Sequence, residues 1–459
     1  MPATAPTKVR FSILTMATVV AFIMYLDRIC LAEIVGSDSF KSNMPLSQDE
    51  VRQWVKTLFF WLPSTWQESL GNTNPVDLIK GAFFWAYALA QVPAGWLSDR
   101  YGARNLIGLY IAAWSLFTAA TSFSWGFTSL MIARLGCGLA EAGYYPASSG
   151  MLTRWAHRDH RGFASSMISW GGRVGGFLAP VLTAFVILKF GDWRSAGYIY
   201  GFGGLFVAVA FWWIYRDHPR LHPRCNDAEI ELLAEGRGEF LPVKQAPRRF
   251  PWKAAVSSGN LWFMNGYQFL TNIGWAFLIL TLSDYLREVI KLDTATASLI
   301  TSVALFIGIV ALPIGGVITD RLAKRFGLRM GRVLLLSSTR FVAAGCYLAA
   351  LGVDPERYWL MAICFGAVAF FADLALPATW ATMQDISGKH QAQLFGWANM
   401  WGNFGAALQP ILFAYVLRAF DVNRDYSEGI LLCACAFAVS GFVALGINPQ
   451  RPVVKEDRA

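Results

Sequence analysis

Twelve largely apolar stretches divide this 459-residue chain, and polar segments separate them. An α-helix of about 20 apolar residues crosses the roughly 30 Å hydrocarbon core of a bilayer. The pattern therefore predicts an all-α membrane protein with twelve transmembrane helices. The expected spans are 12–34, 81–98, 105–125, 128–152, 162–188, 194–215, 261–283, 296–319, 332–352, 357–384, 393–418 and 427–447.

The composition agrees with a lipid environment. Hydrophobic residues make up 55% of the chain and charged residues 15%, and the mean hydropathy is +0.41. The net charge of +9 does not indicate nucleic acid binding, because the Lys and Arg residues lie in loops between apolar spans.

The loop charges predict the orientation in the cell (inner) membrane. Alternate loops collect most of the loop Lys and Arg residues on one side, which the positive-inside rule makes cytoplasmic. Both termini then lie in the cytoplasm. The first apolar stretch is too long for a signal-peptide core, so we expect it to be retained as the first span. The basic residues and segments on this side include Lys8, Arg100, Arg104, Arg154, Arg158, Arg161, 216–260 and the Arg321 to Arg332 cluster.

A polar segment near the centre, 216–260, predicts a linker between two halves. Residues 1–215 would form an N-terminal six-helix bundle and 261–459 a C-terminal one. An internal repeat supports two pseudo-symmetric bundles, because Gly-x-x-x-Asp-Arg follows the second span at 95–100 and the eighth at 316–321.

The segment 36–80 between the first two spans is unusually long. It contains an aromatic, apolar run at 54–66 that is too short to span a bilayer and is bounded by charge. We expect either a lid or interfacial helix on the outer face or a purely structural addition there.

Four motifs resemble a known family. The loop Gly-x-x-x-Asp-Arg-x-Gly-x-Arg at 95–104 is similar to the signature loop of the major facilitator superfamily. The stretches 25–28 (Tyr-Leu-Asp-Arg), 84–93 and 134–146 resemble its anion:cation symporter branch, which includes bacterial hexuronate, galactonate and glucarate transporters and, more distantly, sialin and vesicular glutamate transporters. The resemblance implies proton-coupled symport of a small organic anion, such as a sugar acid, by alternating access. Sodium is the alternative coupling ion.

Ionisable residues inside spans are the main candidates for function. Each costs roughly 2.5–3.5 kcal/mol to insert, so such residues are usually kept for transport pathways or ion pairs. Arg134 and Glu141 lie about 10 Å apart along one helix, too far for a direct pair, so each needs a partner on another helix. The intramembrane set is Asp27, Arg28, Arg134, Glu141, Arg173, Arg340 and Asp373.

The resemblance places proton coupling on Asp27 and Glu141 and substrate binding on Arg28. Burial favours protonation of a carboxyl group, whereas a nearby arginine favours the carboxylate. A substrate carboxylate that takes Arg28 as its bidentate partner would make the released acid easier to protonate. The alternative is a static interhelical network that holds the bundle closed.

Three further ionisable residues have open roles. Arg173 lies among glycines that leave space beside a long cation, so it either binds the anion or pairs structurally. Arg340 is expected to extend toward the cytoplasmic side or to pair with Asp373. Asp373 is itself a candidate polar site in the C-terminal half, and we group it with Arg134 as a charge network.

The uncharged candidates for substrate binding come from the resemblance. They occupy places where the family presents hydroxyl-binding or stacking groups, although Trp and Tyr are common in any span. These residues are Tyr87, Thr379, Trp380 and Asn403.

The two signature loops predict a charge latch between helix ends on the cytoplasmic side. Such a latch biases alternating access without touching substrate. Its members would be Asp99, Arg100, Arg104, Asp320 and Arg321.

Other classes of function are disfavoured. We expect no metal at His157 and His160 or at His218, His222 and Cys225, no cofactor, and no disulfide framework among the seven cysteines. Neither a P-loop nor a Gly-x-Ser-x-Gly motif is present, so an enzyme is not expected. The competing hypotheses are a proton-driven exporter of lipophilic cations, against which Arg28 and Arg173 argue, and a non-transporting membrane sensor. A monomer is expected.

Overall fold

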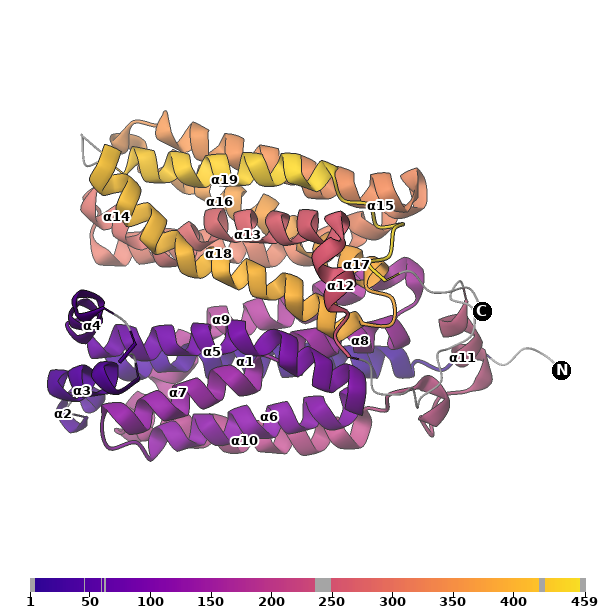
Figure 1. Cartoon of the computed structure of the whole chain (residues 1–459), viewed down its shortest axis with the longest axis horizontal. Coiled ribbons are helices and arrows are strands. Elements are labelled where there is room, and N and C mark those ends of the chain that lie inside the picture. Colours follow the sequence, from indigo (N-terminus) through magenta and orange to yellow (C-terminus); the bar gives the residue numbers. More distant parts are fainter. Residues whose placement is uncertain are drawn as a thin grey trace.

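The fold consists of two helical bundles that lie side by side with their long axes parallel (Figure 1). The computed structural model describes residues 5–44, 46–58, 60–61, 63–235, 249–420 and 426–454, and their regular structure is entirely helical. This confirms the predicted all-α membrane fold with two bundles of six spans.

The helices of both bundles correspond to the twelve predicted spans. The first bundle contains α1 (Val9–Gly36), α5 (Pro75–Tyr101), α6 (Ala103–Ser122), α7 (Phe127–Glu141) with α8 (Tyr144–Trp155), α9 (Arg161–Phe190) and α10 (Arg194–Ile214). The second contains α13 (Gly259–Leu280) with α14 (Leu282–Glu288), α15 (Thr294–Leu351), α16 (Tyr358–Leu374) with α17 (Leu376–Ile386), α18 (Gln391–Phe420) and α19 (Ser427–Leu445). α15 holds two spans, because Gly327 has a φ of 77° and breaks the helix.

Not every span is apolar enough to be recognised alone. Within the described residues six helices are long and apolar enough to cross a membrane, and α13 with α14, bent by 50°, makes a seventh. α15 counts once in that set although it crosses twice. The remaining crossings are α5, α6, α7 with α8, and α18, which carry more polar or small residues.

Two spans are broken at equivalent places in the two bundles. The fourth span breaks between α7 and α8, just before Pro146, and the tenth between α16 and α17, just before Pro377. Proline lacks an N–H donor and clashes with the preceding turn, so helices tend to end before it. Each break follows closely on an acid, Glu141 or Asp373, which places both acids within the membrane.

Glycines let α9 and α18 pack directly against the first helix of their bundles. A Cβ atom at Gly175 would lie 2.2 Å from the Phe22 carbonyl oxygen in α1, and one at Gly405 would lie 2.2 Å from that of Phe269 in α13. The two bundles therefore repeat the same close helix contact. Matching positions are Gly172, Gly175 and Pro180 in α9, and Gly402, Gly405 and Pro410 in α18.

We expect Gly175→Ala to destabilise the protein by about 1–3 kcal/mol, because the added methyl group must push α9 away from the α1 backbone. Gly203→Ala in α10 is the matched control, since no atom lies within 4 Å of its Cβ position. That control should be neutral or stabilising, because alanine favours helix more than glycine does. Thermal unfolding in detergent measures both, and equal melting temperatures would contradict the contact.

The long segment 36–80 folds onto the first bundle. It forms α2 (Asp38–Asn43), α3 (Gln48–Leu58) and α4 (Ser64–Gly71), and its residues 45, 59 and 62 lie outside the described part. The Glu50 carboxylate accepts the backbone N–H of Phe127 at the start of α7, at 3.0 Å. Trp61 and Trp66 are exposed. Its role as a lid or interfacial helix stays a prediction.

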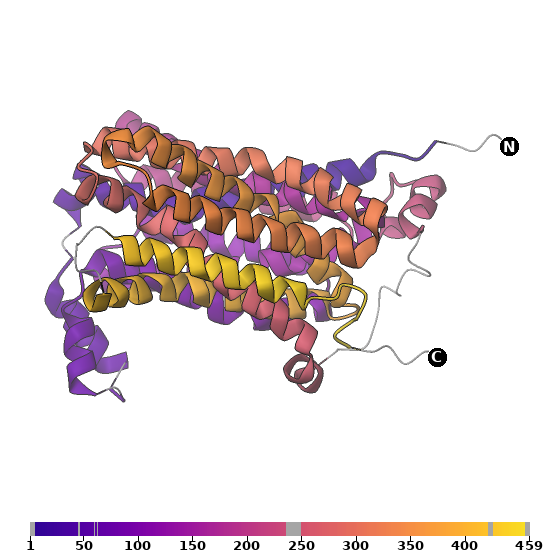
Figure 2. The same cartoon turned by 90° about the horizontal axis from the view of Figure 1, so that it is seen from above.

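Both described ends of the chain lie at the same end of the bundles, opposite α2, α3 and α4 (Figures 1 and 2). We call this end the terminal face. The linker helix α11 (Asp227–Ala234) also lies there, followed by α12 (Trp252–Ser257), whereas linker residues 236–248 are outside the described part. We propose 1–215 and 261–459 as the domains that the linker 216–260 joins.

The linker helix α11 is tied to the start of α1 through Glu229. Its carboxylate accepts the backbone N–H groups of Val9 and Arg10 at 3.2 and 3.1 Å and pairs with the Arg10 guanidinium at 3.0 Å. Burial alone would raise the pKa of Glu229, but hydrogen bonds from Thr7 and from the Arg10 and Val9 backbone lower it below its ordinary value. The linker thus caps the first transmembrane helix.

Candidate functional site

An ion pair between α1 and α7 occupies the middle of the first bundle. Arg28 Nε and Nη2 both donate to Oε2 of Glu141, at 2.9 and 2.8 Å. The Glu141 side chain is fully buried, whereas that of Arg28 is 11% exposed. Glu141 therefore pairs with a charge on another helix, as expected from its position, and part of the Arg28 side chain remains exposed to solvent.

Aromatic rings surround the Arg28 guanidinium. Its Cζ atom lies 4.4 Å from the ring centroid of Tyr87, 4.7 Å from that of Tyr25 and 5.0 Å from that of Phe83. Cation–π contacts of this kind hold a guanidinium in one orientation. Sequence reasoning selected Tyr87 but missed Tyr25 and Phe83, although Tyr25 stands in the same short motif as Arg28.

Two further charges of this bundle, Arg134 and Asp27, are close to the pair. Arg134 donates from Nη2 to the Arg28 carbonyl oxygen at 3.2 Å, so it supports α1 at this point. Asp27 is fully buried, and neither carboxylate oxygen accepts a hydrogen bond from any described residue. The indole N–H of Trp114 lies near this carboxylate and interacts with it, although the two groups do not have hydrogen-bond geometry. A buried carboxylate without a partner is costly, so Asp27 is an unusual group.

A second intramembrane ion pair joins the two bundles. Arg173 of α9 donates from Nη2 to Oδ1 of Asp373 in α16, at 2.9 Å. Their side chains are 20% and 8% exposed. The Arg173 Cζ atom also lies 4.1 Å from the centroid of the Trp275 indole in α13. Both partners of Arg173 thus belong to the opposite bundle, and sequence reasoning missed Trp275.

The predicted roles of Arg340 are wrong. Arg340 neither pairs with Asp373 nor extends to the surface, because it is 1% exposed and donates to the carbonyl oxygens of Phe371 and Ala372 at 3.3 and 3.1 Å. These carbonyls stand in the last turn of α16, where the helix break removes their intrahelical partners. Arg340 therefore caps a broken helix.

A chain of aromatic side chains connects the surroundings of the two ion pairs. The Tyr25 and Tyr145 rings lie 6.4 Å apart, and Tyr145 meets Trp380 of the opposite bundle at 5.1 Å between centroids. A Cβ atom at Gly172 would lie 2.7 Å from the Tyr145 hydroxyl, so this glycine leaves room for the tyrosine beside Arg173. Trp380 is thus at the bundle interface, whereas Tyr145 was not selected from the sequence.

Thr379 and Asn403 are bonded to their own helices. Thr379 Oγ1 donates to the Ala375 carbonyl oxygen at 3.1 Å, and Asn403 Nδ2 donates to that of Asn399 at 2.8 Å. These bonds turn both polar groups toward local backbone rather than toward either ion pair. Their substrate-binding role stays a prediction.

Two aspartates of the signature loops bridge the bundles at the terminal face. Asp99 of α5 accepts the backbone N–H groups of Ala392 and Gln393 at the start of α18, at 3.1 and 3.0 Å. Asp320 of α15 accepts those of Gly162 and Phe163 at the start of α9, both at 2.8 Å. A carboxylate at a helix N-terminus satisfies free N–H donors and interacts favourably with the helix dipole.

The signature glycines explain how the aspartates come so close. A Cβ atom at Gly95 would lie 2.4 Å from the Ala392 carbonyl oxygen, and one at Gly316 would lie 2.4 Å from the Ser166 hydroxyl. Any side chain at either position would therefore push the bundles apart. The Gly-x-x-x-Asp spacing puts the glycine one helical turn before the aspartate, on the same face.

In the described part of the chain, the arginines predicted for this latch make no contact between the bundles, so their place in the latch stays a prediction. Arg100 lies over the rings of Trp96 and Tyr101 on its own helix, and Arg321 is exposed. Arg104 donates to the Trp212 carbonyl oxygen at 2.9 Å, which ties α6 to α10 within one bundle.

Three other charges complete the latch. Asp385 of α17 pairs with Arg161 of the opposite bundle at 3.1 Å and with Arg332 at 3.4 Å, and Arg332 lies 3.9 Å from Asp320. Because Arg161 and Arg332 stand at span ends, they were assigned to ordinary loop charge, and Asp385 was not selected from the sequence. The bridging set is therefore Asp99, Asp320, Arg161, Arg332 and Asp385, which we call the latch.

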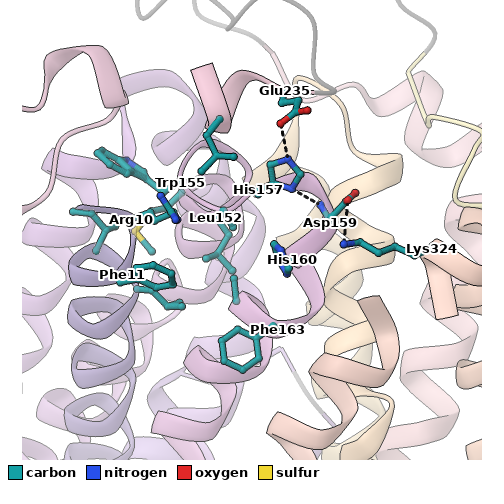
Figure 3. Close-up of a pocket in the computed structure, with 16 residues that line it drawn as sticks. Arg10, Phe11, Leu152, Trp155, His157, Asp159, His160, Phe163, Glu235 and Lys324 are labelled. Atoms are coloured by element: carbon teal, nitrogen blue, oxygen red, sulfur yellow. Dashed lines mark hydrogen bonds and ion pairs between the residues drawn. The ribbon is translucent and has the colours of Figure 1, made fainter. Parts of the chain in front are cut away.

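A cavity of about 630 Å³ opens beside the latch, with Phe11, Trp155 and Phe163 among its lining residues (Figure 3). At one edge of the cavity, Asp159 Oδ2 pairs with Nζ of Lys324, which comes from the opposite bundle, at 3.3 Å. His157 Nε2 lies 3.8 Å from Oε2 of Glu235. No group of three or more metal-ligand side chains occurs within the described residues.

The comparisons with known proteins decide the family. The sequence model of the Major Facilitator Superfamily matches residues 55–410 and 266–459. The chain belongs to this superfamily. It is therefore a multi-pass membrane transporter and not an enzyme, as the motifs predicted.

Two bacterial proteins are similar in sequence to this chain over most of their own length, and one human structure shares its fold. The probable sulfoacetate transporter SauU of Cupriavidus necator is 26% identical over 85% of this chain and 89% of its own. The probable galactarate/D-glucarate transporter GudP of Bacillus subtilis is 26% identical over 99% of this chain and 95% of its own. The crystal structure of the human organic anion transporter MFSD10 (TETRAN) shares the fold, with a TM-score of 0.66 and 14% identity over 95% of this chain and 99% of that one.

Proposed function

We propose that this transporter moves a small organic anion, a sugar acid, by proton-coupled symport with alternating access. The observation that carries the proposal is Arg28, a partly exposed intramembrane arginine whose guanidinium is held by rings and by one oxygen of Glu141. The names of the two bacterial relatives, which concern sulfoacetate and the sugar diacids galactarate and glucarate, support an anionic substrate.

Arg28 is the proposed binding group for a substrate carboxylate. Its aromatic neighbours fix the guanidinium plane, and a planar fork of N–H donors matches a carboxylate in bidentate geometry. Tyr87 and Tyr25 border the place that the carboxylate would take. The positive charge of Arg28 repels a lipophilic cation, which argues against the exporter hypothesis.

Glu141 and Asp27 are the proposed proton carriers. A substrate carboxylate that takes Arg28 leaves Glu141 buried without its cation, which favours the neutral acid. No described residue donates a hydrogen bond to the Asp27 carboxylate even before substrate arrives, so we propose that Asp27 carries a proton in this conformation. Anion and proton would then enter together.

The closed latch indicates which conformation this is. The bundles are tied at the terminal face, which the positive-inside rule makes cytoplasmic in the cell membrane. We therefore propose that the conformation is closed toward the cytoplasm, and that release of the latch lets the bundles rock to expose substrate on that side. A single chain contains both bundles, so the proposed functional unit is a monomer with only substrate, protons and lipid as partners.

Transport into proteoliposomes tests the proposal directly. We expect at least one of two labelled sugar acids, galactonate and galactarate, to accumulate when the external medium is more acidic than the lumen, and a protonophore should abolish the accumulation. Arg28→Gln should reduce specific uptake at least about tenfold, because it removes the charge-assisted bonds to the anion.

Controls for that assay separate the competing hypotheses. Accumulation driven by a sodium gradient at equal pH would show that the coupling ion is sodium rather than the proton. Uptake or efflux of lipophilic cations without any effect of organic acids would reject the anion transporter. Arg52→Gln, an exposed arginine of the outer segment, is the matched control and should transport normally.

A further inference from the structure

Arg173 is the second arginine that reaches the interface between the bundles, and the proposed function leaves it without a task. Its acid partner lies in the opposite bundle, unlike that of Arg28, which lies in the same one. We infer that the substrate is a dianion, with one anionic group on Arg28 and the second on Arg173 in place of Asp373. The inference rests on the proposed function and specifies its substrate class.

The surroundings of Arg173 are built to hold a guanidinium while its anion changes. Trp275 lies against the guanidinium at 4.1 Å and makes a contact that does not depend on the acid. A single donor, Nη2, is bonded to a single oxygen of Asp373. A carboxylate in that place shows that an anion fits there, and a substrate group of the same chemistry can replace it.

Asp373 lies beside a glycine and next to a helix break. A Cβ atom at Gly308 would lie 2.8 Å from Oδ2 of Asp373, so this glycine provides the room that the carboxylate occupies. Asp373 stands one residue before the end of α16, next to the helix break. Once released from Arg173, its buried carboxylate is favoured as the neutral acid and takes a proton from the aqueous side.

Arg28 and the stretch of α9 that carries Arg173 border the same tyrosine ring. The Arg28 guanidinium lies 4.7 Å from the centroid of the Tyr25 ring. Cβ atoms at Gly172 and Gly176, on either side of Arg173 in sequence, would meet the same ring at 3.0 and 3.1 Å. A single tyrosine ring therefore lies between Arg28 and the α9 backbone that carries Arg173, which suits a ligand with a short carbon chain.

A substrate with a single anionic group cannot replace both Glu141 on Arg28 and Asp373 on Arg173. It would take Arg28 and leave the Arg173–Asp373 bridge closed, so the bundles would stay tied within the membrane. A dianion replaces both acids, and its second group opens the bridge between the bundles. Substrate selection and release of the bundles would then depend on the same arginine.

Matched ligands test the inference in the purified wild-type protein. Galactarate and galactonate differ only at one end, where a carboxylate replaces a hydroxymethyl group, and glucarate and gluconate form a second such pair. We expect each diacid to bind at least about tenfold more tightly than its monoacid, the effect of one charge-assisted contact. Calorimetry or competition against labelled uptake measures this ratio.

Two variants separate substrate binding from a structural lock. Arg173→Gln should bring the diacid-to-monoacid ratio close to one and leave monoacid affinity unchanged. Asp373→Asn should strengthen diacid binding about threefold or more, because the competing carboxylate is gone. A structural lock predicts the opposite pattern, with equal losses for both ligands in Arg173→Gln and no gain in Asp373→Asn.

The outcomes also separate this inference from the proposed function. Equal binding of diacids and monoacids by the wild type, or tighter binding of monoacids, overturns the dianion and leaves the anion transporter intact. Binding of neither class, together with no uptake of either, overturns both. Arg154→Gln, a half-exposed arginine at the terminal face, is the control and should keep the wild-type ratio.

Discussion

Glu141→Gln is expected to abolish uphill accumulation of substrate while leaving substrate binding nearly intact. Glutamine keeps the shape of the side chain and can still accept a hydrogen bond from Arg28, so the site stays assembled. It cannot carry a proton, so the coupling step is lost. We expect the accumulation ratio in a pH gradient to fall at least about tenfold, toward simple equilibration across the membrane.

Counterflow provides the matched measurement for this variant. Exchange of labelled for unlabelled substrate needs no net proton movement, so Glu141→Gln should exchange at a rate near that of the wild type. Substrate affinity should also lose the part of its dependence on pH that comes from Glu141. Glu356→Gln, an exposed residue of an outer loop, should behave as wild type. Unchanged accumulation and unchanged pH dependence in Glu141→Gln would remove Glu141 from the coupling mechanism.

The partner of Glu141 could be predicted, whereas that of Asp373 could not. Two charges seven residues apart on one helix cannot pair, and Arg28 was available on a neighbouring span, which the structure shows to be the partner. For Asp373 the adjacent span offered Arg340, but that arginine binds carbonyls freed by the break in α16. Apolar composition runs through the break, so the loss of backbone partners that attracts Arg340 does not show in the pattern.

The residues of the latch were likewise predictable from the sequence only in part. The signature motif identified Asp99 and Asp320 as important, and both lie at the bundle interface. Their partners are backbone N–H groups at helix starts, which carry no side-chain signal, so basic residues within the motif were chosen instead. The approximate places of the spans, by contrast, follow from their length and hydropathy, because each of the twelve predicted spans overlaps a helix or a broken pair of helices, although the exact helix ends differ by several residues.

Asp99→Asn is expected to open the terminal face about tenfold more often than in the wild type. The Asp99 carboxylate accepts two N–H groups at the N-terminus of α18, and charge-assisted bonds of this kind are worth about 1.5–3 kcal/mol each. The neutral amide keeps an oxygen acceptor but loses the charge that interacts with the helix dipole. A loss of about 1.4 kcal/mol changes the population ratio of two conformations tenfold.

Modification of a buried cysteine at the interface measures this opening. Ser149 is fully buried and accepts a hydrogen bond from Gln391 of the opposite bundle, so Ser149→Cys should react with a thiol reagent only when the face opens. Adding Asp99→Asn should raise the rate at position 149 about tenfold, and adding Asp320→Asn as well should raise it further, because the two contacts are separate. Asp49→Asn on the exposed outer segment should leave the rate unchanged. An equal rate with and without Asp99→Asn would mean that Asp99 stabilises its own bundle rather than the closed face.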